Sequence, residues 1–147
     1  MFAIHYPEPS FRVKKEKGRE HIFDALRKKW LLLTPEEWVR QNFIQHLVQV
    51  LQYAPALIAQ EKMIKVGELS RRFDILVYDR HHRPFMLVEC KAPEVALDET
   101  VWRQALTYYS HIQSGIMVIT NGHHAAAWQK ENNRLTALGR LPASAEI

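Results

Sequence analysis

Apolar side chains recur at two different spacings along this chain, and the spacings predict where helices and strands lie. Between residues 35 and 52 they return every three or four residues, which is the spacing of one face of a helix. Thr34, Pro35 and Glu37 supply an N-cap, a first-turn proline and a capping box, so we expect the helix to begin here. A second stretch with helical spacing covers residues 97–113.

Short apolar runs bounded by turn residues predict the strands. These runs lie at 57–66, 73–78, 85–91 and 115–120, and a last hairpin covers 125–138. The run 115–120 is apolar throughout, as expected for a strand that is covered on both faces. The runs 73–78 and 85–91 enclose a polar turn and therefore predict an antiparallel hairpin.

The order of these elements predicts an α/β fold, with a mixed β-sheet flanked by helices in the sequence α-β-β-β-α-β. Neither an internal repeat nor a linker divides the chain, so we expect a single domain over residues 1–147. Within this domain we distinguish a small N-terminal annex (1–33), a core (34–138) and a tail (139–147) that we expect to be frayed.

The composition supports a folded domain and limits where the protein can act. The 147 residues are 47 % hydrophobic and 24 % charged, which excludes a disordered chain. Apolar runs stay short of the roughly 18–20 residues of a membrane helix, and the N-terminus lacks the apolar centre of a signal peptide. We therefore expect a cytoplasmic protein without a membrane segment. Cys90 is the single cysteine, so an internal disulfide is excluded.

Basic residues gather in clusters and favour a polyanionic partner. The net charge is +4 and the isoelectric point is about 9.3. Two clusters lie in the annex, at residues 14–19 and 27–29. A third cluster consists of Arg71 and Arg72, just ahead of the acidic strand residue Asp74.

Acidic residues inside apolar strands need an explanation, because a buried and unpaired carboxylate is costly. Asp74 lies near the start of the strand FDILVY, and Glu89 lies near the end of the strand FMLVECK. In an antiparallel hairpin the start of the first strand lies beside the end of the second, so we expect the two carboxylates to converge. Lys91 follows two residues later, which by strand alternation places it on the same face as Glu89.

This grouping suits the hydrolysis of a phosphodiester. Mg²⁺, or Mn²⁺ in its place, binds carboxylate oxygens together with waters and phosphate oxygens, and Asp74 with Glu89 offer the carboxylates. We include the backbone carbonyl of Cys90 as a further ligand. Lys91 is suited to hold or deprotonate the attacking water, or to stabilise the anionic transition state. The alternative is a structural ion pair, Glu89–Lys91 or Asp74–Arg72, at the wet end of a sheet.

The segments RRFDILVYD, PFMLVECKAP, RQALTYY and VITNG, in this order, resemble the N-terminal nuclease domain of type I restriction enzyme R subunits. That domain belongs to the PD-(D/E)xK, restriction-endonuclease-like superfamily, and the resemblance implies its fold over roughly residues 20–125. The stretch TPEEWVRQNFI resembles the helix that precedes the core in those proteins. Phe73 stands where the motif is named for proline, at a position that varies in the superfamily.

The resemblance implies a role for each matching residue. Asp74 and Glu89 would be metal ligands, and Lys91 would be the catalytic lysine. Gln104 and Tyr108 would form the Q-x-x-x-Y element near the site, which helps to position DNA or water.

The family also carries a glutamate on its first helix, and two residues of this chain could match it. On a helical wheel Glu36 falls near the middle of the apolar stripe, whereas Glu37 falls towards its edge and already has a capping role. We therefore favour Glu36 for the site.

The leading function is metal-dependent endonuclease cleavage of DNA, in a restriction, repair or mobile-element system. Arg71, Arg72 and the basic annex would contact DNA backbone phosphates without reading the base sequence. Tyr108 would also contact the DNA, and a homodimer or partner subunits would supply specificity. We expect no ATP-driven translocation, because the sequence lacks a G-x-x-x-x-G-K-[ST] loop. One alternative is a catalytically idle DNA-binding or assembly module of the same fold. Another is a small metal-dependent hydrolase or a protein-interaction domain that binds no nucleic acid.

Overall fold

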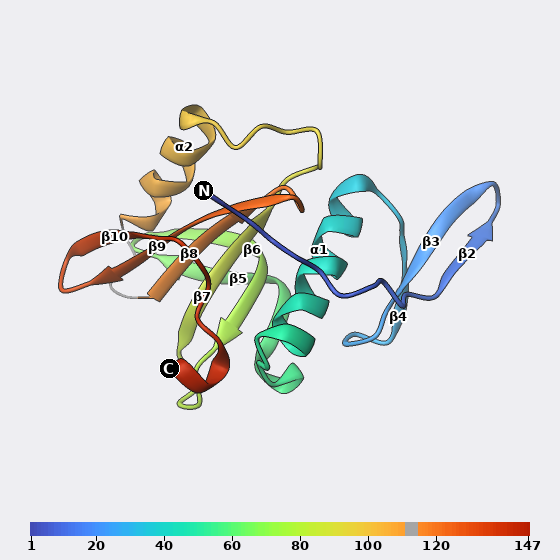
Figure 1. Cartoon of the computed structure of the whole chain (residues 1–147), viewed down its shortest axis with the longest axis horizontal. Helices are drawn as coiled ribbons and strands as arrows, with labels where there is room; N and C mark the ends of the chain where they lie inside the picture. The colour runs from blue at the N-terminus through green and yellow to red at the C-terminus, as the bar shows by residue number, and fades with distance from the viewer. Residues whose placement is uncertain (111–114) are drawn as a thin grey trace.

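A mixed β-sheet forms the centre of the protein (Figure 1). The computed structural model describes residues 1–110 and 115–147, except for the side chains of Val66 and Tyr108. The strands follow the order β1-β9-β8-β7-β6-β5, and β10 pairs with β9. Their bounds are β1 (Phe2–Ala3), β5 (Ile58–Val66), β6 (Leu69–Tyr78), β7 (Pro84–Cys90), β8 (Gly115–Thr120), β9 (His124–Glu131) and β10 (Arg134–Leu138). β7 and β8 are parallel, and the other described pairs are antiparallel.

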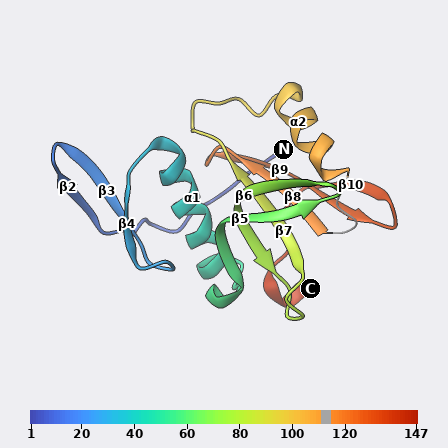
Figure 2. The ribbon, with the colours of Figure 1, turned by 180° about the vertical axis from the view of Figure 1, so that it is seen from behind.

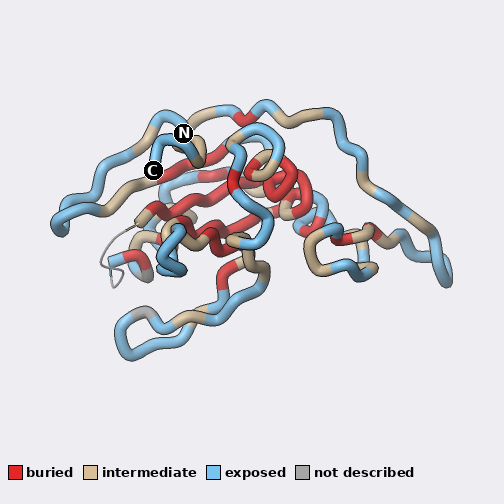
Figure 3. The backbone as a smooth tube through the Cα atoms, turned by 90° about the horizontal axis from the view of Figure 1, so that it is seen from below, coloured by how far each residue is buried: buried red, intermediate tan, exposed pale blue. Residues whose placement is uncertain are grey.

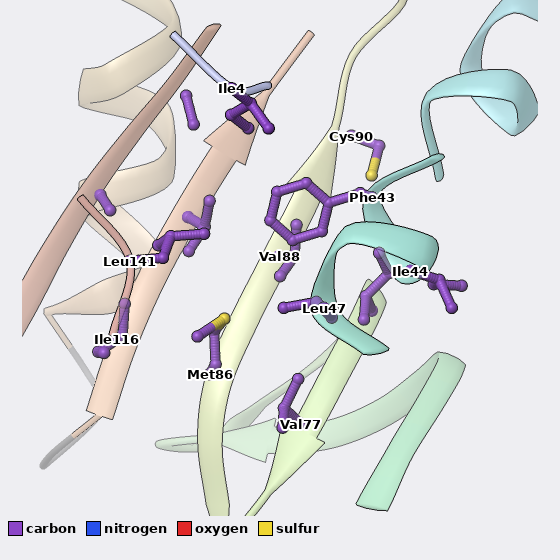
Figure 4. Packing of buried hydrophobic residues seen from close by; sticks show 14 of the residues in the cluster. Ile4, Phe43, Ile44, Leu47, Val77, Met86, Val88, Cys90, Ile116 and Leu141 are labelled. Atoms are coloured by element: carbon purple, nitrogen blue, oxygen red, sulfur yellow. The ribbon is translucent and has the colours of Figure 1, made fainter. Parts of the chain in front are cut away.

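Two helices pack against opposite faces of this sheet. They are α1 (Pro35–Gln45), which continues into the π-helical turn η1 (His46–Val50), and α2 (Glu99–Tyr109). Successive strand residues point to opposite faces, so Ile75 joins the apolar cluster under α1 and Leu76 joins the cluster under α2. Figure 4 shows the first cluster, with Phe43 and Leu47 lying over the strands. The sheet is therefore buried on both faces at its centre.

Residues 11–33 of the annex form a second, three-stranded sheet that extends beyond α1 (Figures 1 and 2), whereas β1 joins the main sheet. Its antiparallel strands are β2 (Val13–Glu16), β3 (Arg19–Asp24) and β4 (Lys29–Leu32). Lys17 and Gly18 connect β2 to β3, and both have positive φ angles, 52° and 76°. A two-residue turn with these angles suits the twist of a tight hairpin. Figure 3 shows that burial is concentrated in the main sheet and α1, whereas the hairpin tips are exposed.

The architecture agrees with the predicted α/β fold. The order α-β-β-β-α-β of the core is confirmed, as are the hairpin of β6 and β7 and the last hairpin with its turn at Asn132–Asn133. The predicted helix 97–113 corresponds to α2, and residues 111–113 lie outside the described part of the chain. Within the described residues, no helix combines the length and apolar character that crossing a membrane requires.

The C-terminal tail differs from the expectation that it is frayed. Leu141 is buried in the cluster under α1, and the hydroxyl of Tyr53 donates to the carbonyl of Pro142 at 2.7 Å. The backbone N–H of Ser144 donates to the carbonyl of Leu51 at 2.8 Å. The prediction was wrong because one apolar side chain and one buried hydroxyl, distant in sequence, give this short segment a place to dock.

Candidate active site

The β6–β7 hairpin brings Asp74 and Glu89 to the same end of the sheet. The ladder pairs Ile75 with Val88, and the next residues outward are Asp74 and Glu89, where this pairing ends. One carboxylate oxygen of Asp74 accepts the backbone N–H of Cys90 at 2.8 Å. Asp74 therefore caps the end of β7 directly beside Glu89.

The backbone of Cys90 contributes to the same place. In an extended strand the N–H and C=O of one residue point to the same edge, and the N–H of Cys90 points to Asp74. Its carbonyl is consequently directed to the β6 side as well. The side chain of Cys90 points to the helix side of the sheet and is buried in the cluster under α1. Burial, followed by the charge of Asp74, raises the pKa of this thiol.

Glu89 forms an ion pair with a neighbouring arginine of β6. Its side chain is 11 % exposed and contacts the guanidinium of Arg71, which also lies 5.4 Å from the centre of the Phe73 ring. Asp74 is more open, with 39 % of its side chain exposed, and its second oxygen lies 4.0 Å from Nη1 of Arg40. The pairs Glu89–Lys91 and Asp74–Arg72, which the sequence left open, do not form. Two other arginines take these positions.

Lys91 presents a cation with no partner in the described structure. Its backbone N–H donates to the carbonyl of Thr120 at 2.7 Å, which fixes the chain as it leaves β7. Its side chain is half-buried, and its ammonium makes no hydrogen bond or ion pair with any described residue. The segment after it is held by Asn121, whose side-chain amide donates to the carbonyl of Val95 at 2.9 Å.

Helix α1 reaches this end of the sheet with its first turns. The turn between β8 and β9 allows a close approach, because a Cβ at Gly122 would lie only 3.2 Å from a methyl group of Val39, and the φ of Gly122 is +94°. The negative charges of both Glu36 and Glu37 contribute to the raised pKa of Cys90, so both lie within electrostatic reach of β7.

The two helix glutamates have different surroundings. Glu37 is buried, and its carboxylate accepts hydrogen bonds from Arg40 and, at 2.9 Å, from the amide of Gln41. Glu36 is exposed. The sequence placed Glu36 in the buried stripe and Glu37 at its edge, and this assignment of burial was wrong. Thr34 caps the helix, since its hydroxyl accepts the backbone N–H of Glu37. The carboxylate of Glu37 bonds Arg40 and does not complete the predicted capping box.

A chain of ion pairs connects Asp74 to the annex, and the sequence did not reveal it. Arg40 contacts Glu37 and Asp74, and it also pairs with Glu61 of β5 at 3.4 Å. Glu61 accepts a hydrogen bond from Arg27 at 2.8 Å, and Arg27 donates to the fully buried Asp24 at 2.6 Å. The chain therefore alternates in charge from the annex to the site.

Backbone geometry turns Glu61 towards this network. Glu61 has a φ of 52°, although it lies within β5, and the ladder pairs Gln60 with Ile75 and Lys62 with Phe73 without a pair between them. The missing pair would join Glu61 to Asp74. The hydrogen bond from Arg27 lowers the pKa of Glu61, and the charge of Arg40 acts in the same direction. Burial opposes ionisation of Arg40, but the hydrogen bond to Glu37 and the surrounding carboxylates raise its pKa above the usual range.

Of the remaining predicted residues, those with described side chains form no hydrogen bond or ion pair with this centre. Gln104 is exposed on α2 and makes no hydrogen bond with the described residues of the site. The side chain of Tyr108 lies outside the described part of the chain. Arg72 is exposed on β6, opposite Met63 of β5.

The oxygen atoms at this centre fit a hard divalent cation. Within the described residues, no group of three or more His, Cys, Asp or Glu side chains is arranged to hold a metal ion. Two carboxylates, Asp74 and Glu89, and the backbone of Cys90 nevertheless lie at neighbouring positions where β7 ends, with Asp74 directed to Arg40 and Glu89 to Arg71. Mg²⁺ commonly binds through one or two carboxylates and keeps several waters, so this donor set suits it. Glu89 would have to share its carboxylate between the cation and Arg71.

Comparison with known proteins identifies a family and a structure of similar fold. The family model described as "Type I restriction enzyme R protein N terminus (HSDR_N)" matches residues 35–142. None of the curated proteins matches the chain. A crystal structure of a DUF820 protein from Anabaena variabilis ATCC 29413, described as a candidate nuclease, is 13 % identical, with a TM-score of 0.48. The similarity covers 96 % of this chain and 88 % of that one.

Proposed function

The chain belongs to the family of the Type I restriction enzyme R protein N terminus, and we propose that it is a metal-dependent nuclease that cleaves DNA. The observation that carries this proposal is the geometry at the end of the β6–β7 hairpin. Asp74 and Glu89 lie at neighbouring positions of adjacent strands, and Lys91, whose ammonium has no partner among the described residues, follows Glu89 by two residues. That combination suits phosphodiester hydrolysis at Asp74, Glu89 and Lys91.

Each of these groups has a distinct part in the proposed reaction. Asp74, Glu89 and the carbonyl of Cys90 would hold Mg²⁺, with Mn²⁺ as a substitute. Mg²⁺ held there supplies a more acidic water and neutralises charge that develops on the phosphate. Lys91 would orient or deprotonate the attacking water, or stabilise the anionic transition state. The hydrogen bond from the N–H of Cys90 keeps the carboxylate of Asp74 at the end of the strand.

The surrounding residues would bind and orient the substrate. Arg71 and Arg72 precede Asp74 on β6, where they would contact backbone phosphates without reading the base sequence. Gln104 and Tyr108 of α2 would help to position DNA or water. A homodimer or partner subunits would supply sequence specificity, and the reaction would take place in the cytoplasm as part of restriction, repair or mobile-element activity.

The test uses purified protein and supercoiled plasmid with Mg²⁺, with Mn²⁺, and with EDTA. We expect nicking or linearisation only with the metals, and a loss of at least about 100-fold in Lys91→Ala, the scale of a general acid–base contribution. Lys65→Ala, at an exposed lysine of β5, is the matched control and should retain full activity. Unchanged thermal unfolding of Lys91→Ala shows that the loss is chemical. Cleavage that persists in EDTA, or in Lys91→Ala, rejects the proposed site.

One observation favours a second function, that of a catalytically idle DNA-binding or assembly module. Both acidic residues already face protein cations, Glu89 facing Arg71 and Asp74 facing Arg40. An idle module would bind DNA equally well in EDTA, would not cleave it, and would be unaffected by Asp74→Ala. Measurements of binding and cleavage on the same preparation therefore separate the two functions.

A further inference from the structure

The net positive charge of the protein comes from residues 11–33, the part of the annex that forms the second sheet. Residues 11–33 contain eight Lys and Arg against three Asp and Glu, a net charge of +5. The remaining 124 residues contain twelve Lys and Arg against thirteen Asp and Glu, a net charge of −1. The annex also lies ahead of residues 35–142, the part of the chain that defines the family.

Most of this charge is exposed and uncompensated. Five cations of the annex are exposed and have no side-chain hydrogen bond or ion pair within the described structure. They are Lys15, Lys17, Arg19, Lys28 and Lys29. Two of the three acids are already engaged, since Asp24 is buried against Arg27 and Glu16 pairs with Lys14. Repulsion among these cations is relieved most effectively by a polyanion.

The paired strands of the annex hold these cations at fixed positions. The tight turn at Lys17 and Gly18 joins two paired strands, and β4 extends the sheet on the other side of β3. The guanidinium of Arg12 lies over the Phe23 and Trp30 rings, at 4.8 Å and 5.3 Å from their centres. The spacing of the charges is therefore set by β-sheet register before any ligand binds.

Ion pairs connect the three-stranded sheet of the annex to the rest of the domain next to the candidate active site. Arg27, which follows β3, bonds Glu61, and Glu61 pairs with the same Arg40 that faces Asp74. Lys15 and Arg19 border a surface hollow whose other wall includes Pro35 at the start of α1. The second sheet and the main sheet thus lie on either side of α1 (Figure 2), and Arg40 of this helix faces Asp74.

We propose that the annex is a nucleic-acid-binding arm, which holds the phosphates of duplex DNA so that the backbone passes over Asp74 and Glu89. This inference rests on the proposed function for the position of the cleaved bond, but not for binding itself. The contacts are with phosphates and are independent of base sequence, because lysines and arginines at a sheet surface neutralise charge without reading base edges.

The test measures binding of a fluorescent 20-base-pair duplex in EDTA, by anisotropy, between 50 and 200 mM salt. The arm variant combines Lys15→Gln, Lys17→Gln and Arg19→Gln. The control variant combines Arg80→Gln, Arg134→Gln and Arg140→Gln, three exposed arginines outside the annex. Both variants lose three positive charges, but at different places on the surface.

We expect the arm variant to bind at least about tenfold more weakly at 50 mM salt, because three phosphate contacts are lost. Its log–log slope of affinity against salt should be smaller by about 2 to 3, at roughly 0.9 for each contact. The control variant should follow the wild type within about twofold. In cleavage assays the arm variant should raise KM and leave kcat and the half-saturating metal concentration unchanged.

Three results would overturn the inference. They are equal loss of affinity in the two variants, an unchanged salt slope in the arm variant, and absence of binding by the wild type at 50 mM salt. Binding of polyglutamate is measured in the same way. If the arm variant loses affinity for polyglutamate but binds DNA as the wild type does, the surface binds an acidic protein instead. The arm variant could lose affinity as expected while the wild-type protein does not cleave DNA. That result would support the role of the annex in binding and reject the proposed nuclease function.

Discussion

At the scale of single residues, the two helix glutamates offer the most direct test of the geometry. Glu37 is buried and bonded to Arg40, so Glu37→Gln should destabilise the protein by about 1–3 kcal/mol, the usual range when a charged hydrogen bond is lost. Glu36→Gln is the matched control at an exposed position and should change stability little. Urea unfolding of both variants measures the difference. Equal stability of the two would show that Glu37 is not held as the structure indicates.

Cys90 allows a second residue-scale prediction. Burial and the nearby charge of Asp74 raise the pKa of its thiol, so little thiolate should be present in the native protein. Native protein at pH 8 should therefore resist iodoacetamide for an hour, and unfolding in guanidinium should allow complete alkylation within minutes. Mass spectrometry of the intact chain detects the adduct. Rapid labelling of the native state would contradict the burial of Cys90.

The residues of the site differ in how far the sequence could reveal them. Asp74 and Glu89 were predicted as neighbours because strand alternation and one hairpin fix their positions. Arg40 and Glu61 were not predicted, because they meet only after α1 packs beside β5, and no local spacing encodes that contact. Glu37 was misjudged because a helical wheel gives the relative angles of side chains but not which edge of the stripe meets the sheet.

At the scale of secondary-structure elements, the predicted strands and helices were confirmed where a local signal exists. The capping residues of α1 and the asparagine turn of the last hairpin are such signals. The two-residue strand β1 was not predicted, because it forms only by pairing with β9, far away in sequence. The irregularity at Glu61 was also not predictable, since a glutamate with positive φ inside a strand contradicts its local propensity.

The ion-pair chain that joins these elements should make stability depend on acid pH. Burial would raise the pKa of Asp24, but hydrogen bonds and charge from Arg27 outweigh burial and lower it. The stabilisation is therefore complete above the unfolded-state pKa and is lost as pH falls through the lower pKa of the folded state. Asp24→Asn should be less stable than wild type at pH 7, and the gap should shrink below about pH 4.

The measurement for this element-scale prediction is urea unfolding between pH 2.5 and 7. Glu131→Gln, at an exposed carboxylate of β9, serves as the control and should follow the wild type across this range. A gap between Asp24→Asn and wild type that stays constant down to pH 2.5 would mean that the pKa of Asp24 is not lowered by folding.

At the scale of the whole molecule, the docked tail covers part of the hydrophobic core near the β6–β7 turn. Leu141 is only 5 % exposed and lies in the cluster under α1 (Figure 4), so the core includes this residue of the tail. Leu141→Ala should cost about 2–3 kcal/mol, because a buried leucine loses transfer free energy and leaves a cavity. For a domain of this size that corresponds to a fall of about 5–10 °C in Tm.

Leu135→Ala is the matched control, since Leu135 is 43 % exposed on β10, and its Tm should change far less. Thermal unfolding by circular dichroism distinguishes the two variants, and a fall in Tm that is equal in both would show that the tail is frayed after all. DNA binding by Leu141→Ala at 20 °C should match wild type, because the tail packs near the β6–β7 turn, away from Asp74 and the annex. We therefore expect the tail, near the β6–β7 turn, to contribute to stability. Asp74 at the other end of this hairpin and the annex would interact with nucleic acid.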